Sequence, residues 1–307
     1  MSFRLKPEVP IATEIRRLVL RQLQVAISEL RTVGDPESDE AIHDARRRVK
    51  KIRAVIRLVR PVLDKTYRTV DRELKDVSKL LAPVADGQGI LETLDQMAHR
   101  YRKLLPKEAV RSIRTGLRER SARTDREASA RGVIKRAADT LRSEAKRVKS
   151  WSIQGEGFDA IGPGLEESYR RAREGMILAW SKPKAAHYHS WRRYVKDHWF
   201  HVRLVEENCG NHLLPLQRRL EALDGLLGEY HNTVILREIL GTDWYTSHRE
   251  TTRCLRVVSR YQRLLRRHAE TLGVRVYSEK PNRYLRRVRR YWNGAVKSES
   301  AQRKGAE

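Results

Sequence analysis

Apolar residues recur every three or four positions along most of the chain, the spacing that places them on one face of an α-helix. Strand-like alternation of apolar and polar residues is nearly absent. Helices are predicted over residues 11–30, 39–63, 66–82 and 89–105, and over 107–150 with a join near Gly132. The pattern therefore predicts an all-α protein.

One clear loop interrupts this pattern near the middle of the chain. Gly155-Glu156-Gly157 and Gly162-Pro163-Gly164 bracket it, and glycine and proline are the residues that most often break helices. We therefore expect a boundary near residue 155. It divides the chain into an N-terminal helical bundle, residues 1–154, and a C-terminal helical bundle, residues 155–307.

The second half repeats the first at a constant offset of 146 residues. HDARRRVK at residues 43–50 falls on HSWRRYVK at residues 189–196, and Arg57-Leu58-Val59 falls on Arg203-Leu204-Val205. Chance rarely keeps one offset across some fifty residues, so the repeat indicates an internal duplication. It predicts two similar antiparallel helical bundles related by pseudo-two-fold symmetry.

The chain of 307 residues is strongly basic. Lysine and arginine total 65 against 39 aspartates and glutamates, a formal net charge of +26, and arginine supplies 48 of the 65. This balance excludes an acidic enzyme and makes a polyanion the first partner to consider. The arginine bias suits oxyanions, because a guanidinium presents a planar fork of donors and keeps its charge; GC-rich coding is the other source of such a bias.

Composition also limits the other classes of protein. Cys209 and Cys254 are the only cysteines, so neither a disulfide scaffold nor a cysteine-based zinc site is expected. No apolar run approaches the ~18 residues of a membrane span, and the first residues lack the apolar core of a signal peptide. We expect no membrane partner and a cytoplasmic location.

The helix predicted from residue 39 carries its basic residues on one stripe. With about 100° per residue and His43 at zero, the basic residues lie between roughly 260° and 340° and the apolar residues between about 120° and 240°. The basic residues are Arg46, Lys50, Arg53, Arg57 and Arg60. The same stripe in the second half consists of His189, Arg192, Lys196 and Arg203, with Trp199 at the position of Arg53.

Such a stripe has two interpretations. Like charges three and four residues apart destabilise a helix by a few tenths of a kcal/mol per pair, so keeping them in two helices favours binding of an extended external anion. The alternative is that acids on a neighbouring helix neutralise the stripe within a salt-bridge network.

These two segments resemble the signature helices of a known family. His-x-x-Arg-x-x-x-Lys-Lys-x-Arg at residues 43–53 and His-x-Trp-Arg-Arg-x-x-Lys at residues 189–196 are similar to those of the CHAD family, the histidine-containing α-helical domain. Phe3-Arg4-Leu5 resembles the opening of that family. Two further segments resemble its Leu-Gly-x-x-Arg-Asp element: Leu80-Leu81-x-x-x-Ala85-Asp86 and Leu227-Gly228-Glu229-x-His231-Asn232. The resemblance covers about residues 3–293 in total. Ala85 and Asn232 depart from that element, which commonly has arginine and aspartate there.

The resemblance implies two antiparallel helical bundles around a basic central groove that binds inorganic polyphosphate. It also implies association with polyphosphate granules, as in many members. Composition and periodicity by themselves indicate only an extended anion. The expected partner is therefore inorganic polyphosphate, or another phosphate or sulfate anion.

The candidate binding residues lie on the two stripes, beside them, and on a third basic helix. His43 and His189 have three roles open to them: phosphate donor, orienter of a neighbouring arginine, or buried packing residue. The predicted polyphosphate-binding residues are His43, Arg46, Arg47, Lys50, Lys51, Arg53, Arg57, His189, Arg192, Arg193, Lys196 and Arg203, with Arg72, Lys75 and Lys79 on the third helix. Arginines of the C-terminal helices, among them Arg263 and Arg267, are further candidates to extend the basic surface.

Two other functions use the same residues. A nucleic-acid-binding protein is one, because net charge does not separate phosphate polymers; most aromatic residues, such as Trp191, however, sit on predicted apolar faces. A metal-dependent phosphohydrolase is the other, with His198, His201, Glu206 and Glu207 as the nearest metal ligands. No His-Glu-x-x-His signature and no Gly-rich phosphate loop is present, so we expect no catalysis, no cofactor and no metal.

Overall fold

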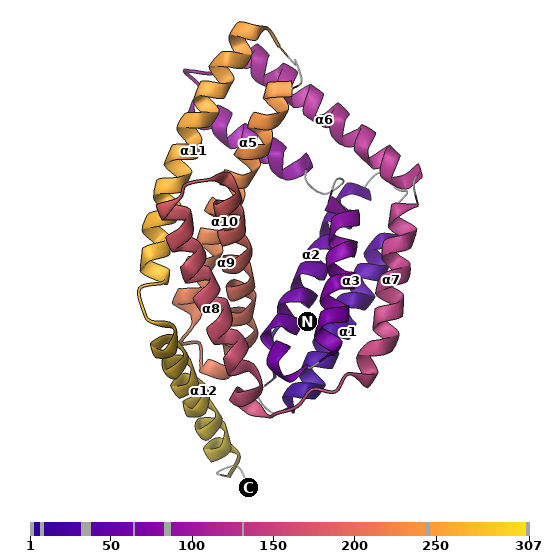
Figure 1. The fold of residues 1–307 in the computed structure, drawn as a ribbon, viewed down its shortest axis with the longest axis vertical. Coiled ribbons are helices and arrows are strands. Elements are labelled where there is room, and N and C mark those ends of the chain that lie inside the picture. The colour runs from indigo at the N-terminus through magenta and orange to yellow at the C-terminus, as the bar shows by residue number, and fades with distance from the viewer. Residues whose placement is uncertain are drawn as a thin grey trace.

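The computed structural model describes residues 3–6, 9–31, 38–63, 65–82, 87–130, 132–242 and 246–304. Over these residues the chain forms helices joined by turns and short loops, and no strand (Figure 1). The predicted all-α class is therefore confirmed. The helices, in chain order, are α1 (Ile11–Arg31), α2 (Ser38–Leu58), η1 (Arg60–Val62), α3 (Thr66–Leu80), α5 (Gly87–Arg100), α6 (Lys107–Ala130), α7 (Val133–Arg147), η2 (Val148–Ser150), α8 (Gly157–Ser181), α9 (Ala185–Val205), η3 (Glu207–Cys209), α10 (Leu214–Thr242), α11 (His248–Val276) and α12 (Pro281–Lys304).

Several helix boundaries follow local sequence signals. Gly132, in the left-handed region at φ 60°, separates α6 from α7 at the predicted join. The helix predicted over residues 39–63 ends earlier, at Leu58, and continues as the 3-10 helix η1. Pro61 lies within η1, and its missing N–H cannot extend an α-helix.

The loop predicted between residues 155 and 164 is wrong in its second part. The extended segment ends at Glu156, and α8 begins at Gly157 and contains Gly162-Pro163-Gly164. A Cβ atom on Gly164 would lie 1.9 Å from the carbonyl oxygen of Leu58, so only glycine lets α8 cross the end of α2 this closely. Close packing of two helices therefore outweighs the helix-breaking tendency of this segment.

Two groups of helices face each other in the fold (Figure 1). α1, α2, α3 and α7 pack together in one group, and α8 to α12 pack together in the other. α2 packs against both α8 and α9 and so joins the groups. α5 packs against α10 of the second group, and α6 leads from there back to α7. Helices from the first half of the sequence thus pack against helices of the second half. The division into domains at residues 154 and 155 stays a prediction.

The helices of the two halves correspond approximately at the 146-residue offset. α1 and α8 begin at Ile11 and Gly157, which are 146 positions apart, and α2 and α9 end at Leu58 and Val205, which are 147 apart. The counterpart of α3 and α5 is a single long helix, α10. This order of elements agrees with a duplication, while the pseudo-two-fold relation of two bundles stays a prediction.

Burial of the apolar faces fixes how α2 and α9 are rotated. The predicted apolar residues of α2, and Val59 directly after it, have no exposed surface: Ala45, Val49, Ile52, Val55, Ile56 and Val59. On α9 the same holds for Trp191, Val195, Val202 and Val205. Because the basic stripes lie on other faces of these helices, burial of the apolar faces keeps the stripes out of the core. None of the helices in the described segments combines the length and apolar content that crossing a bilayer needs.

Candidate polyanion site

A pocket of ≈ 300 Å³, here called the central pocket, lies between α2 and α9. Most of its lining comes from these two helices and includes their basic stripes, and α3, α5 and α10 supply the rest. The lining residues are His43, Arg46, Lys50, Arg53, Arg57, Ser78, Gly89, His189, Arg192, Arg193, Lys196, Asp197, Phe200, His231 and Asn232. The structure thus brings nine of the predicted binding residues, from both halves of the chain, around one pocket.

α2 presents four cations to the central pocket at helical spacing. Arg46, Lys50, Arg53 and Arg57 follow one another three or four residues apart, so one face of the helix carries all four. The opposite face is buried in the core, which holds these side chains towards the pocket. All four are half-buried, so their donors are partly withdrawn from water.

α9 adds Arg192, Arg193 and Lys196 to the pocket, and α10 packs against α9. Arg192 passes close to Gly228 of α10, where a Cβ atom would lie 3.1 Å from its Nη2. The glycine of the repeated Leu-Gly element therefore leaves room for a pocket arginine. His189 packs against His231 of α10, with ring centroids 4.5 Å apart.

Carboxylates hold the two innermost arginines of α2. Arg53 donates to Asp71 of α3 at 2.9 Å. Arg57 donates to both carboxylate oxygens of Asp197 on α9 at 2.8 Å and to Asp71 at 3.3 Å. These bonds link α2, α3 and α9 into one network at the base of the stripe.

Ionisation of this network is stabilised by its own charges. Burial lowers the pKa of Arg57, but the charges of Asp197 and Asp71 more than offset this and hold that pKa above its ordinary value. Burial raises the pKa of Asp71, and the hydrogen bond and charge of Arg53, with the charge of Arg57, reverse the effect and hold it below the ordinary value. The arginines are therefore permanent positive charges of the pocket.

A third carboxylate pairs with the cations of α9. Asp224 of α10 lies 2.9 Å from Lys196 Nζ and 3.9 Å from Arg192 Nε. Seven lysine and arginine side chains line the pocket, and Asp71, Asp197 and Asp224 pair with four of them. The interpretation that neighbouring acids neutralise the stripe therefore applies to these four cations of the pocket.

Three predicted residues lie outside the described lining of this pocket: Arg47 and Lys51 beside the first stripe, and Arg203 at the end of the second. Arg47 is exposed on another face of α2. Lys51 Nζ lies 5.4 Å from the centre of the Phe3 ring, and burial, with nearby arginines, lowers its pKa to about 8. Arg203 packs over Trp199, 5.1 Å from the ring centroid, so an aromatic side chain in the second stripe draws its last arginine away from the pocket.

The third basic helix contributes differently from the prediction. Arg72, Lys75 and Lys79 are exposed on α3 and are not among the described lining residues. Asp71 and Ser78, seven residues apart, occupy the face of α3 that meets α2 and the pocket. The helix therefore gives the pocket a carboxylate and a hydroxyl, while its cations point elsewhere.

Sequence reasoning missed several lining residues. His231 and Asn232 belong to the repeated Leu-Gly element, and that motif was the signal that would have found them. Asn232 Nδ2 donates to Gly89 O at 2.9 Å and Thr93 Oγ1 at 3.1 Å, which ties α10 to α5 at the pocket wall. The last part of the first copy, with Ala85 and Asp86, lies outside the described residues.

The two stripe histidines are exposed at the pocket. Of the three roles open to His43 and His189, buried packing therefore does not apply. Phosphate contact and orientation of a neighbouring side chain are the roles that the geometry allows.

The buried histidines of α9 have structural partners. His198 lies within hydrogen-bond distance of the hydroxyls of Tyr277 (3.3 Å) and Tyr284 (3.0 Å), and His201 Nε2 lies 2.8 Å from Ala54 O. Within the described segments, no group of three or more His, Cys, Asp or Glu side chains is placed to hold a metal ion. The pocket chemistry that the geometry supports is hydrogen-bond donation and positive charge.

Comparison with known protein families identifies this architecture. The model of the CHAD domain matches residues 14–241, within the range over which the sequence resembles that family. None of the curated proteins matches the chain. The matched range contains both signature helices, α2 and α9, and the whole lining of the central pocket that the structure describes. The chain therefore belongs to the CHAD domain family.

Proposed function

We propose that the protein binds inorganic polyphosphate in the central pocket, between α2 and α9. The observation that carries this proposal is the lining: seven lysine and arginine side chains from two halves of the chain surround one pocket. Membership of the CHAD family supports polyphosphate among the possible polyanions. Association with polyphosphate granules follows as part of the same proposal.

Recognition rests on charge and on guanidinium geometry. Polyphosphate carries roughly one negative charge per phosphate and contains no nucleobase. A protein therefore recognises it through the spacing of positive charges and through bidentate contacts from arginine. His43, His189 and Arg193 are the exposed lining residues and meet the ligand first. Arg53 and Arg57, held by carboxylates, supply the positive potential deeper in the pocket.

A nucleic acid fits the central pocket less well. Single-stranded nucleic acids gain much of their affinity from bases stacked on exposed aromatic rings. Among the described lining residues the one phenylalanine, tyrosine or tryptophan is Phe200, which is 3% exposed. Trp191, which was predicted to lie on an apolar face, has no exposed surface. The pocket therefore favours a phosphate polymer without bases.

The proposed role is binding rather than catalysis. The cations of the pocket stabilise phosphate charge, and their carboxylate partners are engaged in ion pairs. We propose no metal-dependent step, and incubation with polyphosphate, with or without divalent cations, is expected to release no phosphate. Steady phosphate release that depends on the central pocket would contradict this part of the proposal.

Charge reversal on both stripes tests the site. The double variant Arg46→Glu/Arg192→Glu is compared with Arg123→Glu/Arg253→Glu, which makes the same charge change at exposed positions of α6 and α11 outside the pocket. At about 0.15 M salt we expect the first variant to bind long-chain polyphosphate at least roughly tenfold more weakly, and the second to change little. Unchanged affinity in the folded first variant overturns the site.

Single-stranded RNA at the same phosphate concentration separates the two polymer classes. We expect polyphosphate to displace RNA, and RNA to displace polyphosphate poorly. Equal competition, with both ligands weakened alike in the double variant, would favour the nucleic-acid alternative.

A further inference from the structure

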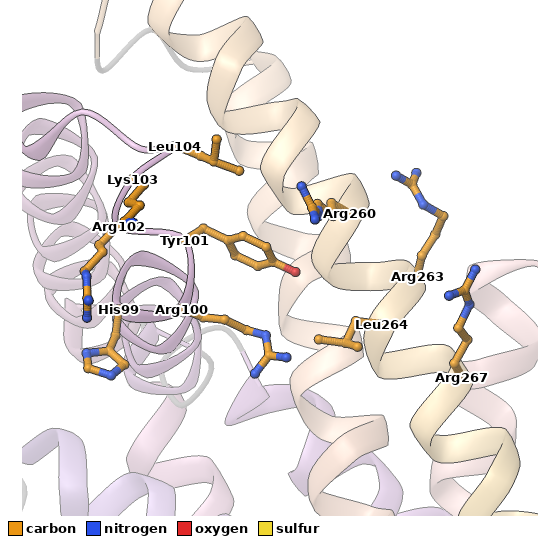
Figure 2. A pocket seen from close by; sticks show the side chains of 10 residues that line it. All are labelled: His99, Arg100, Tyr101, Arg102, Lys103, Leu104, Arg260, Arg263, Leu264 and Arg267. Carbon is orange, nitrogen blue, oxygen red and sulfur yellow. The ribbon is translucent and has the colours of Figure 1, made fainter.

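A second pocket lies away from the central pocket, at the far end of α5. Its volume is ≈ 890 Å³, and it is lined by residues 99–104, which end α5 and form the turn after it, and by Arg260, Arg263, Leu264 and Arg267 of α11 (Figure 2). We call it the peripheral pocket. Figure 2 shows Arg100, Tyr101 and Arg260 in the space between the two segments, whereas Arg263 and Arg267 extend from the other side of the α11 ribbon in this view.

The described lining of the peripheral pocket is cationic without acidic partners. Its six lysine and arginine residues are Arg100, Arg102, Lys103, Arg260, Arg263 and Arg267, and no aspartate or glutamate is among the lining residues that the structure describes. All six side chains are exposed. The central pocket differs, because Asp71, Asp197 and Asp224 pair with its cations.

Helix electrostatics do not account for these cations together. Arg100 ends α5, where a positive charge stabilises the helix dipole. Arg260, Arg263 and Arg267 lie in the middle of α11, three and four residues apart, where they gain nothing from the dipole and repel one another. An anion bound near these side chains would reduce that repulsion.

Aromatic contacts hold the inner part of the pocket in place. The Arg260 guanidinium lies 5.7 Å from the centre of the Tyr101 ring, and that ring packs edge-on against Tyr261 at 5.9 Å. The Tyr261 hydroxyl donates to Glu229 of α10. Arg260 is therefore oriented by a chain of contacts that reaches α10, which lowers the entropy lost when it binds a ligand.

We propose that the peripheral pocket is a second oligophosphate-binding site, and that the protein thereby holds two phosphate chains, or two segments of one chain, at once. The ligand class rests on the proposed function. Gly89 lines the central pocket and His99 the peripheral pocket, ten residues along the same helix, or about 15 Å. A triphosphate is shorter than this separation, so each pocket takes its own. Long chains are then cross-linked, because each protein molecule engages two of them.

Calorimetric titration with tripolyphosphate tests the second site. We expect two binding events per wild-type molecule and one in Arg260→Gln/Arg263→Gln/Arg267→Gln. The matched control is Arg249→Gln/Arg253→Gln/Arg256→Gln, which removes three exposed arginines of the same helix outside the pocket and is expected to keep both events. Two events in the first variant, or an equal loss in the control, would overturn the proposal.

The two proposals fail separately in this experiment. The variant Arg46→Glu/Arg192→Glu is expected to lose the binding event of the central pocket and to keep that of the peripheral pocket. If it instead keeps both events while the α11 variant loses one, the central site is wrong and the peripheral site stands.

Light scattering with long chains of ~100 phosphates gives a second readout. We expect wild-type protein and the control to cross-link the polymer into large particles, and the α11 variant to bind it without doing so. The inference is overturned if the α11 variant scatters light as strongly as the wild type. It is also overturned if the substitutions weaken binding of single-stranded RNA but not binding of tripolyphosphate.

Discussion

Arg57 of α2 donates hydrogen bonds to both carboxylate oxygens of Asp197 on α9, each at 2.8 Å. This ion pair joins the two halves of the chain at the wall of the central pocket. It stabilises the fold and at the same time reduces the charge that an anion meets. Stability and affinity are therefore expected to respond in opposite directions when the carboxylate is removed.

Asp197→Asn is expected to bind polyphosphate more tightly and unfold more easily. Removing one negative charge beside the ligand raises affinity by about 1 kcal/mol, or roughly fivefold. Loss of the charged hydrogen bonds to Arg57 lowers the free energy of unfolding by about 1 to 3 kcal/mol, since Asp71 still holds that guanidinium. Fluorescence anisotropy with labelled polyphosphate and urea unfolding measure the two effects.

Asp95→Asn is the matched control for this substitution. Asp95 pairs with Arg114 at 2.6 Å on the exposed side of α5 and α6, outside the central pocket, so it makes the same change in net charge. We expect its affinity and stability to stay close to wild type. Weaker binding by Asp197→Asn, or an equal gain in the control, would contradict the role given to the ion pair.

The salt dependence of binding reports how many carboxylate pairs the ligand displaces. Seven cations line the central pocket, and Asp71, Asp197 and Asp224 pair with four of them. With about 0.7 counterions released per neutralised phosphate, the log–log slope of affinity against salt lies near −5 if all seven cations exchange their partners for phosphate, and it is shallower if the carboxylate pairs persist. Titrations between about 0.05 and 0.4 M salt measure it. A slope near zero is incompatible with a site that binds through charge.

The basic stripe of α2 was predictable because helical periodicity alone decides it. Arg46 and Lys50 share a face with Arg53 and Arg57 in any α-helix, and the opposite apolar face had to be buried. The outcome in the second half depends on tertiary contacts. Trp199 offers Arg203 a ring to pack on, and no helical wheel shows that this draws the arginine out of the pocket.

The carboxylate partners of the stripes and the peripheral pocket could not be predicted from the sequence, because both depend on tertiary contacts. The chain has 39 acidic residues, and which of them face the stripe depends on how neighbouring helices are rotated. Arg263 and Arg267 were candidates for a basic surface, but their neighbour Arg100 is more than 160 positions away in the chain. Only the packing of α5 against the second half brings these segments together.

Gly164→Ala is expected to damage the fold more than an ordinary helix substitution. The new methyl group would lie 1.9 Å from the Leu58 carbonyl oxygen, so α8 and α2 must move apart. We expect a loss of about 3 kcal/mol or more in the free energy of unfolding, measured by urea denaturation. Gly225→Ala in α10 is the control, because its Cβ meets nothing within 4 Å.

The control is expected to be neutral or to stabilise the protein by up to about 1 kcal/mol, since alanine favours a helix over glycine. Equal stability of the two alanine variants would show that α8 and α2 tolerate a wider separation than the structure indicates.

Two buried histidines make stability depend on pH. Burial lowers the pKa of His198 to about 3 and that of His201 to about 4, against about 6.5 in an unfolded chain. Below pH 6.5 the unfolded state therefore binds more protons than the folded state. Stability is full above that pH and decreases as the pH falls towards 4, by about 1 kcal/mol per histidine for each pH unit.

Urea unfolding at pH 7, 6 and 5 checks this linkage. His198→Gln keeps donors and acceptors for the hydroxyls of Tyr277 and Tyr284 but does not titrate. Its stability is expected to fall less steeply with decreasing pH than that of the wild type. Parallel pH profiles for the two proteins would assign the acid sensitivity to other groups.

A crystal structure of the protein with a short polyphosphate shows directly whether the ligand joins α2 and α9. We expect a phosphate chain in the central pocket, with some phosphates in contact with Arg46 or Lys50 of α2 and others with Arg192 or Lys196 of α9. Phosphates bound only outside that pocket, or touching one of the two helices alone, would contradict it.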